Sequence, residues 1–249
     1  MKRTEPFYRR SDTCNGVTVS SVSSVSSNPE FNPQIAVESL IQTLQESPSR
    51  DLLHVVLTGG GSGMQVNSQL GYVAASLPDS IWNRVHLWWG DERFVPRDSE
   101  QRNDLGIRET LGSFFARDRV HQVAASDDCP SVHAAAHAYA HELKKFANPS
   151  PRFTFVMLGM GPDGHIASLF PHSRQLRALE ACVAVLDSPK PPPERVTMTF
   201  PTLNNSHKTL IFAAGVSKQE ALRRVLAPNG SVDETPARGI TAQALEILG

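Results

Sequence analysis

Apolar residues along this 249-residue chain form short continuous runs that alternate with longer segments of mixed polarity. Short apolar runs bounded by turn residues indicate buried strands, whereas apolar positions three and four residues apart indicate helices that pack on a core. The first pattern predicts strands over residues 52–58, 84–89, 153–160, 182–186, 195–200 and 209–214. The second predicts helices over residues 33–46, 64–75, 104–115, 133–146, 165–170 and 218–226. Strands that alternate with helices predict an α/β fold, with a mostly parallel sheet flanked by helices.

The ends of the chain are less informative than its centre. Residues 16–29 are rich in Ser and Val at a spacing that fits neither a strand nor a long helix, so residues 1–30 form a poorly specified N-terminal segment. No long linker and no internal repeat divides the sequence, and residues 1–249 are expected to form a single domain.

Composition narrows the classes of function. The formal net charge is −1, which provides no basic surface for nucleic acid or for an anionic membrane. The three cysteines are far apart and form no CxxC pair, so neither a disulfide framework nor a zinc–thiolate site is indicated. No apolar run is long enough to span a bilayer, and the N-terminus has no apolar core typical of a secretion signal. We therefore expect a cytoplasmic protein.

Ligands of parallel α/β sheets bind at the carboxyl ends of the strands, so the residues that follow each strand are the candidates for chemistry. TGGGSG, residues 58–63, follows the strand over 52–58 and precedes a helix. Backbone N–H groups of Gly59, Gly60, Gly61, Ser62 and Gly63 can converge on an anion beside the positive end of that helix. The motif is neither a Walker A loop nor GxGxxG. It indicates a phosphate cradle, and a flexible turn is the alternative.

Charged residues follow the strand over 84–89, in the segment GDERFVP. An arginine such as Arg93 close to Asp91 keeps the aspartate ionised and fixes its direction. A surface ion pair is the alternative, but the two preceding tryptophans favour a segment anchored in the core. Asn103 lies just before the helix predicted from residue 104, where it is a candidate N-cap.

The stretch LGMGPDGHIASLFP, residues 158–171, follows the strand over 153–160. Its glycines permit a tight backbone, and Asp163 is placed to cap the helix predicted over 165–170. In the first turn of a helix the dipole disfavours a charged imidazole, so His165 is expected to be neutral and able to accept a proton. The sequence therefore predicts a general base at His165, and an ordinary strand-to-helix turn is the alternative.

Two cations follow later strands. In SPKPPPERVT, residues 188–197, three prolines stiffen the approach to Arg195, whose guanidinium is suited to bidentate contact with phosphate. Lys218 begins the helix predicted over 218–226, with a solvated surface lysine as the alternative. Together with the glycine turn, these residues indicate a small phosphorylated substrate and acid–base catalysis without a cofactor.

One set of histidines suggests a metal. His133, His137 and His141 share one face of the helix predicted over 133–146. No carboxylate or cysteine motif supports a metal there, so an exposed helix face is the preferred interpretation and no metal is expected.

The ordered motifs LTGGGSG, WWGDERFVP, RNDLGIRETL, LGMGPDGHIASLFP, SPKPPPERVTMTF and AAGVSKQEAL resemble those of the glucosamine-6-phosphate isomerase/6-phosphogluconolactonase family. The resemblance runs from about Leu57 to Leu226 and implies a Rossmann-like fold. The chain departs from the family at its last residues, TPARGITAQALEILG, which look short of the final strand that the resemblance implies. Its lactonase branch implies hydrolysis of 6-phospho-D-glucono-1,5-lactone to 6-phosphogluconate, the second step of the oxidative pentose phosphate pathway. That reaction uses a sugar phosphate and needs neither metal nor cofactor.

The resemblance also assigns roles to residues. It implies that His165 activates water with the support of Asp163, and that Asp91 and Arg93 line the sugar site. It implies that the phosphate lies against the glycine turn over 59–63, Arg195 and Lys218. Asn103, next to these motifs in the segment RNDLG, belongs with the substrate-binding residues.

Two alternatives remain open at this point. An amino-sugar phosphate isomerase/deaminase shares the fold, but its relatives look like DEY and GHIAFNEP where this chain has DERFVP and GHIASLFP. A sugar-phosphate sensor would need an N-terminal DNA-binding module, and residues 1–50 contain one plausible helix and no basic stripe. We expect a lactonase that acts as a monomer and binds neither nucleic acid nor a membrane.

Overall fold

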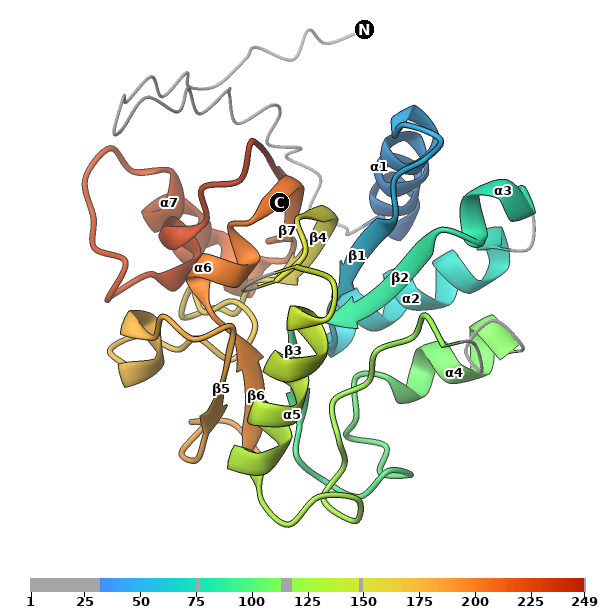
Figure 1. Ribbon diagram of the computed structural model, residues 1–249. Helices are drawn as coiled ribbons and strands as arrows, with labels where there is room; N and C mark the ends of the chain where they lie inside the picture. Colours follow the sequence, from blue (N-terminus) through green and yellow to red (C-terminus); the bar gives the residue numbers. More distant parts are fainter. Residues whose placement is uncertain (1–31, 75–76, 113–117, 148–149, 249) are drawn as a thin grey trace, which may run out of the picture.

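The computed structural model describes residues 32–74, 77–112, 118–147 and 150–248, and its centre is a five-stranded sheet (Figure 1). The strand order is β2 (Val85–Trp89), β1 (Leu53–Leu57), β4 (Phe153–Gly159), β7 (Ser206–Phe212) and β8 (Ala244–Leu248). Every neighbouring pair in this sheet is parallel. The predicted α/β fold with a mostly parallel sheet flanked by helices is therefore confirmed.

The sheet is covered on both faces, which explains its continuous apolar strands. Val55 and Leu57 of β1 pack in a cluster with α1 (Pro33–Glu46), α2 (Gly60–Ala74) and α4 (Leu105–Leu111). Val56, between them, faces a second cluster that includes α5 (Val132–Lys144) and α7 (Gln219–Leu226). Because successive side chains of a strand point to opposite faces, β1 and its neighbours hold the two halves of the core together.

A second, smaller sheet lies on the α5 side of the molecule (Figure 1). Its strand order is β3 (Asp91–Arg93), β6 (Arg195–Met198) and β5 (Cys182–Val185), and both pairings are antiparallel. β3 follows β2 after a single residue, so the chain leaves the parallel sheet and enters the second sheet directly. This step brings the segment that begins at Asp91 next to the segment that begins at Arg195.

The remaining helices are short. They are α3 (Asp79–Trp82), α6 (Phe200–Leu203) and the 3₁₀ turns η2 (Arg174–Arg177), η3 (Val216–Lys218) and η4 (Pro236–Gly239). The longer helices begin as their sequences dictate. Asn32 accepts a hydrogen bond from Gln34 N at the start of α1, and Ser131 accepts one from Ala134 N at the start of α5. No helix within the described ranges is long and apolar enough to cross a membrane.

Three expectations about secondary structure were wrong. Residues 165–170 do not form a helix, because Ile166 pairs with Met160 and Leu169 in isolated antiparallel bridges and Ala167 has φ 48°. The helix expected from residue 64 begins at Gly60, so the glycine turn is its first turn. The expected lack of a final strand was also wrong, since β8 pairs in parallel with β7 along its whole length. The segment over residues 1–30 lies outside the described residues.

Candidate active site

The loop that follows β4 closes tightly on itself. Gly161 N donates a hydrogen bond to His165 O (2.9 Å), and Gly164 N donates one to Gly161 O (3.0 Å). A Cβ atom at Gly161 would overlap the imidazole of His165, and Gly164 has φ 89°. The glycines of this loop therefore make room for the histidine ring and allow the turn beneath it.

His165 and Asp163 form a hydrogen-bonded pair in this loop, from Nδ1 of the ring to Oδ1 of the carboxylate. A carboxylate only accepts hydrogen bonds, so Nδ1 carries the proton and Nε2 of a neutral ring is left as a proton acceptor. Burial tends to raise the pKa of Asp163, but the hydrogen bond and charge of His165 and the charge of Lys190 lower it to about 2. The carboxylate therefore stays ionised at neutral pH, and it fixes which nitrogen of the His165 ring carries the proton.

The carboxylate of Asp91 is held by residues from two other segments. Ser168 Oγ donates a hydrogen bond to Asp91 Oδ2 (2.6 Å), and Nη1 of Arg195 lies 3.9 Å from the same oxygen. Asp91 and Ser168 are both buried. The partner expected for Asp91 was Arg93, but its closest cation in the structure is Arg195, because β3 and β6 are neighbours in the second sheet.

Aromatic contacts connect the histidine with this arginine. The ring of Phe170 lies 4.7 Å from the ring of His165, and Cζ of Arg195 lies 5.8 Å from the centre of the Phe170 ring. Phe170 and Arg195 are both buried. The loop that holds His165 and the second sheet that holds Arg195 therefore belong to one site.

Arg93 and Arg195 face each other across the antiparallel β3–β6 pair. Arg93 Nη1 donates a hydrogen bond to Gln101 O (2.5 Å). Burial lowers the pKa of Arg195, the negative charge of Asp91 opposes this, and the positive charge of Arg93 lowers the pKa further. Two guanidinium groups so close together create a local positive potential, although the whole chain is nearly neutral.

The glycine turn over residues 59–63 lies next to the end of β4 and, through Asn103, next to β3. Gly159 N at the end of β4 donates a hydrogen bond to Thr58 Oγ1 (3.3 Å), which places the ends of β1 and β4 side by side. A Cβ atom at Gly59 would overlap the carboxamide of Asn103, whose Nδ2 donates to Asp91 O (2.8 Å). A Cβ atom at Gly63 would lie 2.6 Å from Thr58 O, so this turn also requires glycine at its inner position.

Asn103 differs from its expected structural role. The residue at the N-cap of α4 is Asp104, and Asn103 instead connects β3 with the glycine turn. Its Oδ1 atom is buried and has no hydrogen-bond partner in the described part of the chain. A buried acceptor without a partner is costly, so this oxygen is suited to a donor group of a ligand.

Lys218 is the last residue of η3 and is half-buried. Burial lowers its pKa, and the positive charge of Lys190 lowers it further. Most of the expected site residues are thus in direct contact with one another, whereas no hydrogen bond or ion pair of its side chain within the described ranges joins Lys218 to them.

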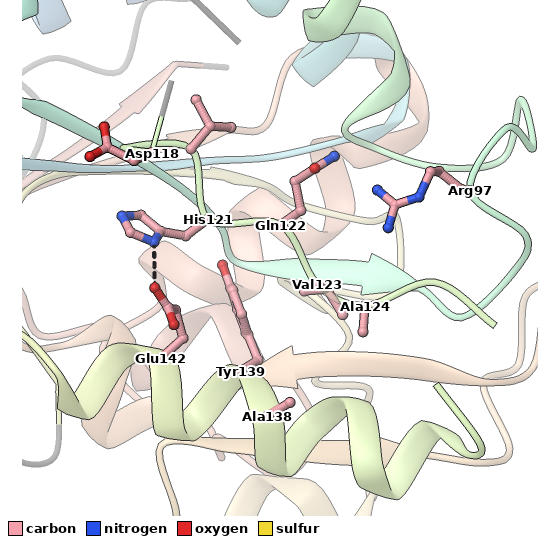
Figure 2. Close-up of a pocket in the computed structure, with 10 residues that line it drawn as sticks. Arg97, Asp118, His121, Gln122, Val123, Ala124, Ala138, Tyr139 and Glu142 are labelled. Carbon is pink, nitrogen blue, oxygen red and sulfur yellow. Dashed lines mark hydrogen bonds and ion pairs between the residues drawn. The ribbon is translucent and has the colours of Figure 1, made fainter. Parts of the chain in front are cut away.

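Two other regions lie apart from this cluster. His133, His137 and His141 are exposed on α5, and no group of three or more metal-binding side chains occurs in the described ranges. A cavity of about 390 Å³ between α5 and residues 118–124 contains none of the expected site residues (Figure 2). His121 and Glu142 form a hydrogen bond in its wall (3.0 Å).

Several residues of the site were not expected from the sequence. They are Ser168, Phe170, Lys190 and Glu92. Glu92 is fully buried and accepts hydrogen bonds from Arg93 N, Asn103 N and Asp104 N (2.7–3.0 Å). Burial raises the pKa of Glu92 to about 7, with a further contribution from the charge of Asp104. The sequence did offer a signal for Glu92. Successive side chains of a strand point to opposite faces, so Glu92 is expected to point away from the face of Asp91 and Arg93.

The fold is that of an α/β protein, and the candidate site lies at the carboxyl edge of its parallel sheet, where such folds bind their ligands. A family described as glucosamine-6-phosphate isomerases/6-phosphogluconolactonase matches residues 30–248. This match covers most of the chain, and the chain belongs to that family.

Named relatives fall in one branch of the family. The chain is 42% identical over 195 residues to the 6-phosphogluconolactonase of Mycobacterium tuberculosis. This alignment covers 74% of this chain and 76% of that protein. It is 39% identical over 228 residues to the 6-phosphogluconolactonase of Streptomyces coelicolor, with 86% of each protein covered. The crystal structure of 6-phosphogluconolactonase from Thermotoga maritima superimposes with a TM-score of 0.72 at 30% identity, over 87% of this chain and 93% of that one.

Proposed function

We propose that this chain hydrolyses 6-phospho-D-glucono-1,5-lactone to 6-phosphogluconate, the second step of the oxidative pentose phosphate pathway. The observation that carries the proposal is the hydrogen-bonded pair of Asp163 and His165 beside a group of cations. The relatives at 39–42% identity are named 6-phosphogluconolactonase, which supports the same activity.

The proposed reaction begins with a water molecule at the lactone carbonyl. His165 Nε2 takes a proton from this water while its oxygen bonds to C1, and Asp163 stabilises the imidazolium that forms. The tetrahedral intermediate then breaks the bond between C1 and the ring oxygen. The imidazolium returns its proton to that oxygen, which becomes the C5 hydroxyl. A lactone is an activated ester, so a positioned base and a stabilised oxyanion are sufficient.

The proposed phosphate site combines backbone and side-chain donors. Gly59, Gly60, Gly61, Ser62 and Gly63 supply N–H groups at the start of α2, an arrangement suited to an anion. Arg195 and Lys218 supply positive charge. Nε and Nη2 of Arg195 already bond to backbone carbonyls, so Nη1 is the nitrogen proposed to meet the substrate.

The sugar is proposed to lie against Asp91, Arg93 and Asn103. Ser168 and Arg195 fix the carboxylate of Asp91, which is suited to accept hydrogen bonds from hydroxyl groups. The unpartnered Oδ1 of Asn103 is a second acceptor for a hydroxyl, while Arg93 is a donor for an oxygen atom of the substrate. These assignments give acceptors for hydroxyl groups and one donor for an oxygen atom of the gluconolactone.

The proposal extends to the setting of the enzyme. We propose a single-domain monomer in the cytoplasm, which binds no nucleic acid and needs neither metal nor cofactor. Unpaired thiols at Cys129 and Cys182 suit a reducing compartment. Light scattering of the purified chain at micromolar concentration checks the monomer, and a dimeric mass contradicts it.

The test uses 6-phosphogluconolactone generated in situ from glucose 6-phosphate, at a pH low enough to slow spontaneous opening. We expect the protein to accelerate disappearance of the lactone and His165→Ala to abolish this acceleration. His172→Ala is the matched control, because His172 also pairs with an aspartate, Asp233, but lies on the surface. Folded protein that leaves the lactone untouched, or that releases ammonia from glucosamine 6-phosphate, would overturn the proposal.

A further inference from the structure

Ser168 connects residues 161–169, here called the histidine loop, with the second sheet. Its Oγ atom donates a hydrogen bond to Oδ2 of Asp91 (2.6 Å), and its N–H group donates one to Oγ1 of Thr197 (3.2 Å). Asp91 and Thr197 lie directly opposite each other in the antiparallel β3–β6 pair. All three residues are buried, Ser168 and Thr197 completely. One serine therefore holds the loop to a carboxylate and a hydroxyl group on neighbouring strands.

The histidine loop is a compact unit in which Ser168 and His165 are closely linked. Only two residues separate them in the chain. Gly161 N donates a hydrogen bond to His165 O (2.9 Å), and Leu169 N donates one to Ile166 O (2.9 Å). Because backbone hydrogen bonds close the loop on both sides of this short stretch, a displacement of the serine also displaces the imidazole.

The two oxygen atoms of the Asp91 carboxylate have different surroundings. Oδ2 accepts the hydrogen bond from Ser168 and lies 3.9 Å from Nη1 of Arg195. No residue in the described part of the chain forms a hydrogen bond with Oδ1. A carboxylate can accept hydrogen bonds at both oxygens, so Oδ1 is available to a hydroxyl group of a sugar. Asp91 thus stands between the sugar site and the histidine loop.

We propose that Ser168 is a positioning residue that couples the carboxylate of Asp91 to the proton-accepting nitrogen of His165. The proposal rests on the proposed function, since it takes Asp91 as a contact of the sugar and His165 as the base. A sugar hydroxyl at Oδ1 fixes Asp91, Asp91 fixes Ser168, and Ser168 fixes the loop that carries the imidazole. The rate of the chemical step therefore depends on Asp91, although this residue exchanges no proton with the lactone.

The kinetic test is a double-mutant cycle on the hydrolysis of 6-phosphogluconolactone. Loss of a hydrogen bond to a charged group corresponds to about a 10- to 100-fold effect, so we expect Ser168→Ala to lower kcat by that factor. We expect KM to change less than about threefold, because the proposed phosphate site is untouched. Asp91→Ala removes the partner of Ser168, so in that background Ser168→Ala should lower kcat by no more than about twofold.

Ser173→Ala is the matched control. It removes a hydroxyl group from the same part of the chain, but Ser173 Oγ has no hydrogen-bond partner among the residues that the structure describes. We expect wild-type kinetic constants for this variant. Losses in kcat that multiply in the double variant, or a kcat for Ser168→Ala equal to that of Ser173→Ala, would overturn the proposal.

Amide hydrogen exchange separates this inference from the proposed reaction, because it needs no turnover. NMR measures exchange at Gly161 N and Leu169 N, which donate hydrogen bonds within the histidine loop. We expect Ser168→Ala and Asp91→Ala each to accelerate exchange at both amides by about tenfold or more, and Ser173→Ala to leave it unchanged. This result in folded protein that hydrolyses no lactone would reject the proposed function and retain the link from Asp91 to the loop. Unchanged exchange in Ser168→Ala and Asp91→Ala would reject the link itself.

Discussion

The carboxylate of Asp163 holds the Nδ1 proton of His165 from within the same short loop. This relationship leaves Nε2 as the only ring nitrogen free to accept a proton, and it depends on an aspartate that stays ionised because its pKa is about 2. The loop is compact because Gly161 bonds to His165 O. The proposed base His165, the carboxylate of Asp163 that orients it and the glycine that closes the loop, Gly161, therefore lie within a few consecutive residues.

Replacing Asp163 by asparagine tests this pair. The Asp163→Asn substitution keeps the size of the side chain but removes the charge that stabilises an imidazolium, so we expect kcat to fall by about 10²- to 10⁴-fold with little change in KM. Steady-state kinetics on the phosphorylated lactone measure both constants. Asp233→Asn is the control, because it removes the same kind of aspartate from a surface pair with His172. A kcat for Asp163→Asn close to that of wild type would exclude the pair from the proton transfer.

The glycine beneath the histidine gives a second prediction. A methyl group at Gly161 would overlap the His165 ring and lie close to Asp163 Oδ1, so Gly161→Ala should displace the ring while the sheet remains intact. A displacement of about 1 Å in a reacting group costs about 10²-fold in rate, and we expect kcat to fall by that order.

Circular dichroism and thermal unfolding of Gly161→Ala check that the fold is retained. Gly106→Ala is the control, since a methyl group there meets only the flexible end of Met64 at 3.8 Å. If Gly161→Ala were fully active and stable, the position of the imidazole would not matter for the reaction.

The phosphate site gives a third prediction. Lys218→Ala and Arg195→Ala should chiefly raise KM, because both cations are proposed to hold the phosphate in the ground state and in the transition state alike. Lys218 makes no ion pair within 4 Å in the described ranges, so its removal should leave stability nearly unchanged. Arg195→Ala also removes three bonds to the backbone carbonyls of residues 190–192, and we expect it to lower thermal stability as well. An unchanged KM in both variants would move the phosphate elsewhere.

Much of the fold could be predicted because the strands are buried on both faces and appear as uninterrupted apolar runs. β1, β2, β4 and the buried end of β7 from Thr209 to Phe212 are of this kind, and the alternation with helices identifies their parallel sheet. β8 was missed because it is an edge strand in which only Ile247 is fully buried, so its sequence lacks that pattern. Residues 166–170 were misassigned because their apolar residues were assigned to a helix. They are buried residues of the loop after β4 that pack against the second sheet, where Ser168 N bonds to Thr197 Oγ1.

The site could be outlined from the sequence because carboxyl ends of parallel strands converge, so the motifs after them were expected to meet. The roles of Asp163, His165, Asp91 and the other residues remain predictions. Ser168 could not be found this way, because it bonds to Asp91 in a different segment. Its position depends on the packing of the loop after β4 on the second sheet, which no local pattern specifies.

A cluster of buried histidines on the opposite part of the sheet predicts sensitivity to acid. His54, His86 and His121 are stacked beside Trp88, and His86 Nδ1 lies 2.9 Å from His121 Nε2. His121 also bonds to Glu142 (Figure 2). Burial, with the neighbouring histidines, lowers the pKa of His54 to about 3 and contributes to lowering that of His86 to about 4.

The sign of the effect follows from proton uptake. In the unfolded chain these histidines titrate near pH 6.5, whereas in the folded protein His86 and His54 stay neutral down to about pH 4 and 3. Between pH 6.5 and 4 the unfolded state binds more protons, so the free energy of unfolding falls as the pH falls. Each histidine contributes at most about 1.4 kcal/mol per pH unit.

Urea unfolding at pH 7, 6 and 5 measures this slope. His54→Gln should reduce it, because glutamine still offers an acceptor to Trp88 Nε1, which bonds to His54 Nδ1 at 3.1 Å, but does not titrate. His133→Gln is the control, since His133 is exposed on α5 and its removal should leave the slope unchanged. Identical slopes for wild type and His54→Gln would mean that the buried cluster is not the source of acid sensitivity. A reduced slope would show that the half of the sheet away from the proposed catalytic residues sets the acid limit of the fold.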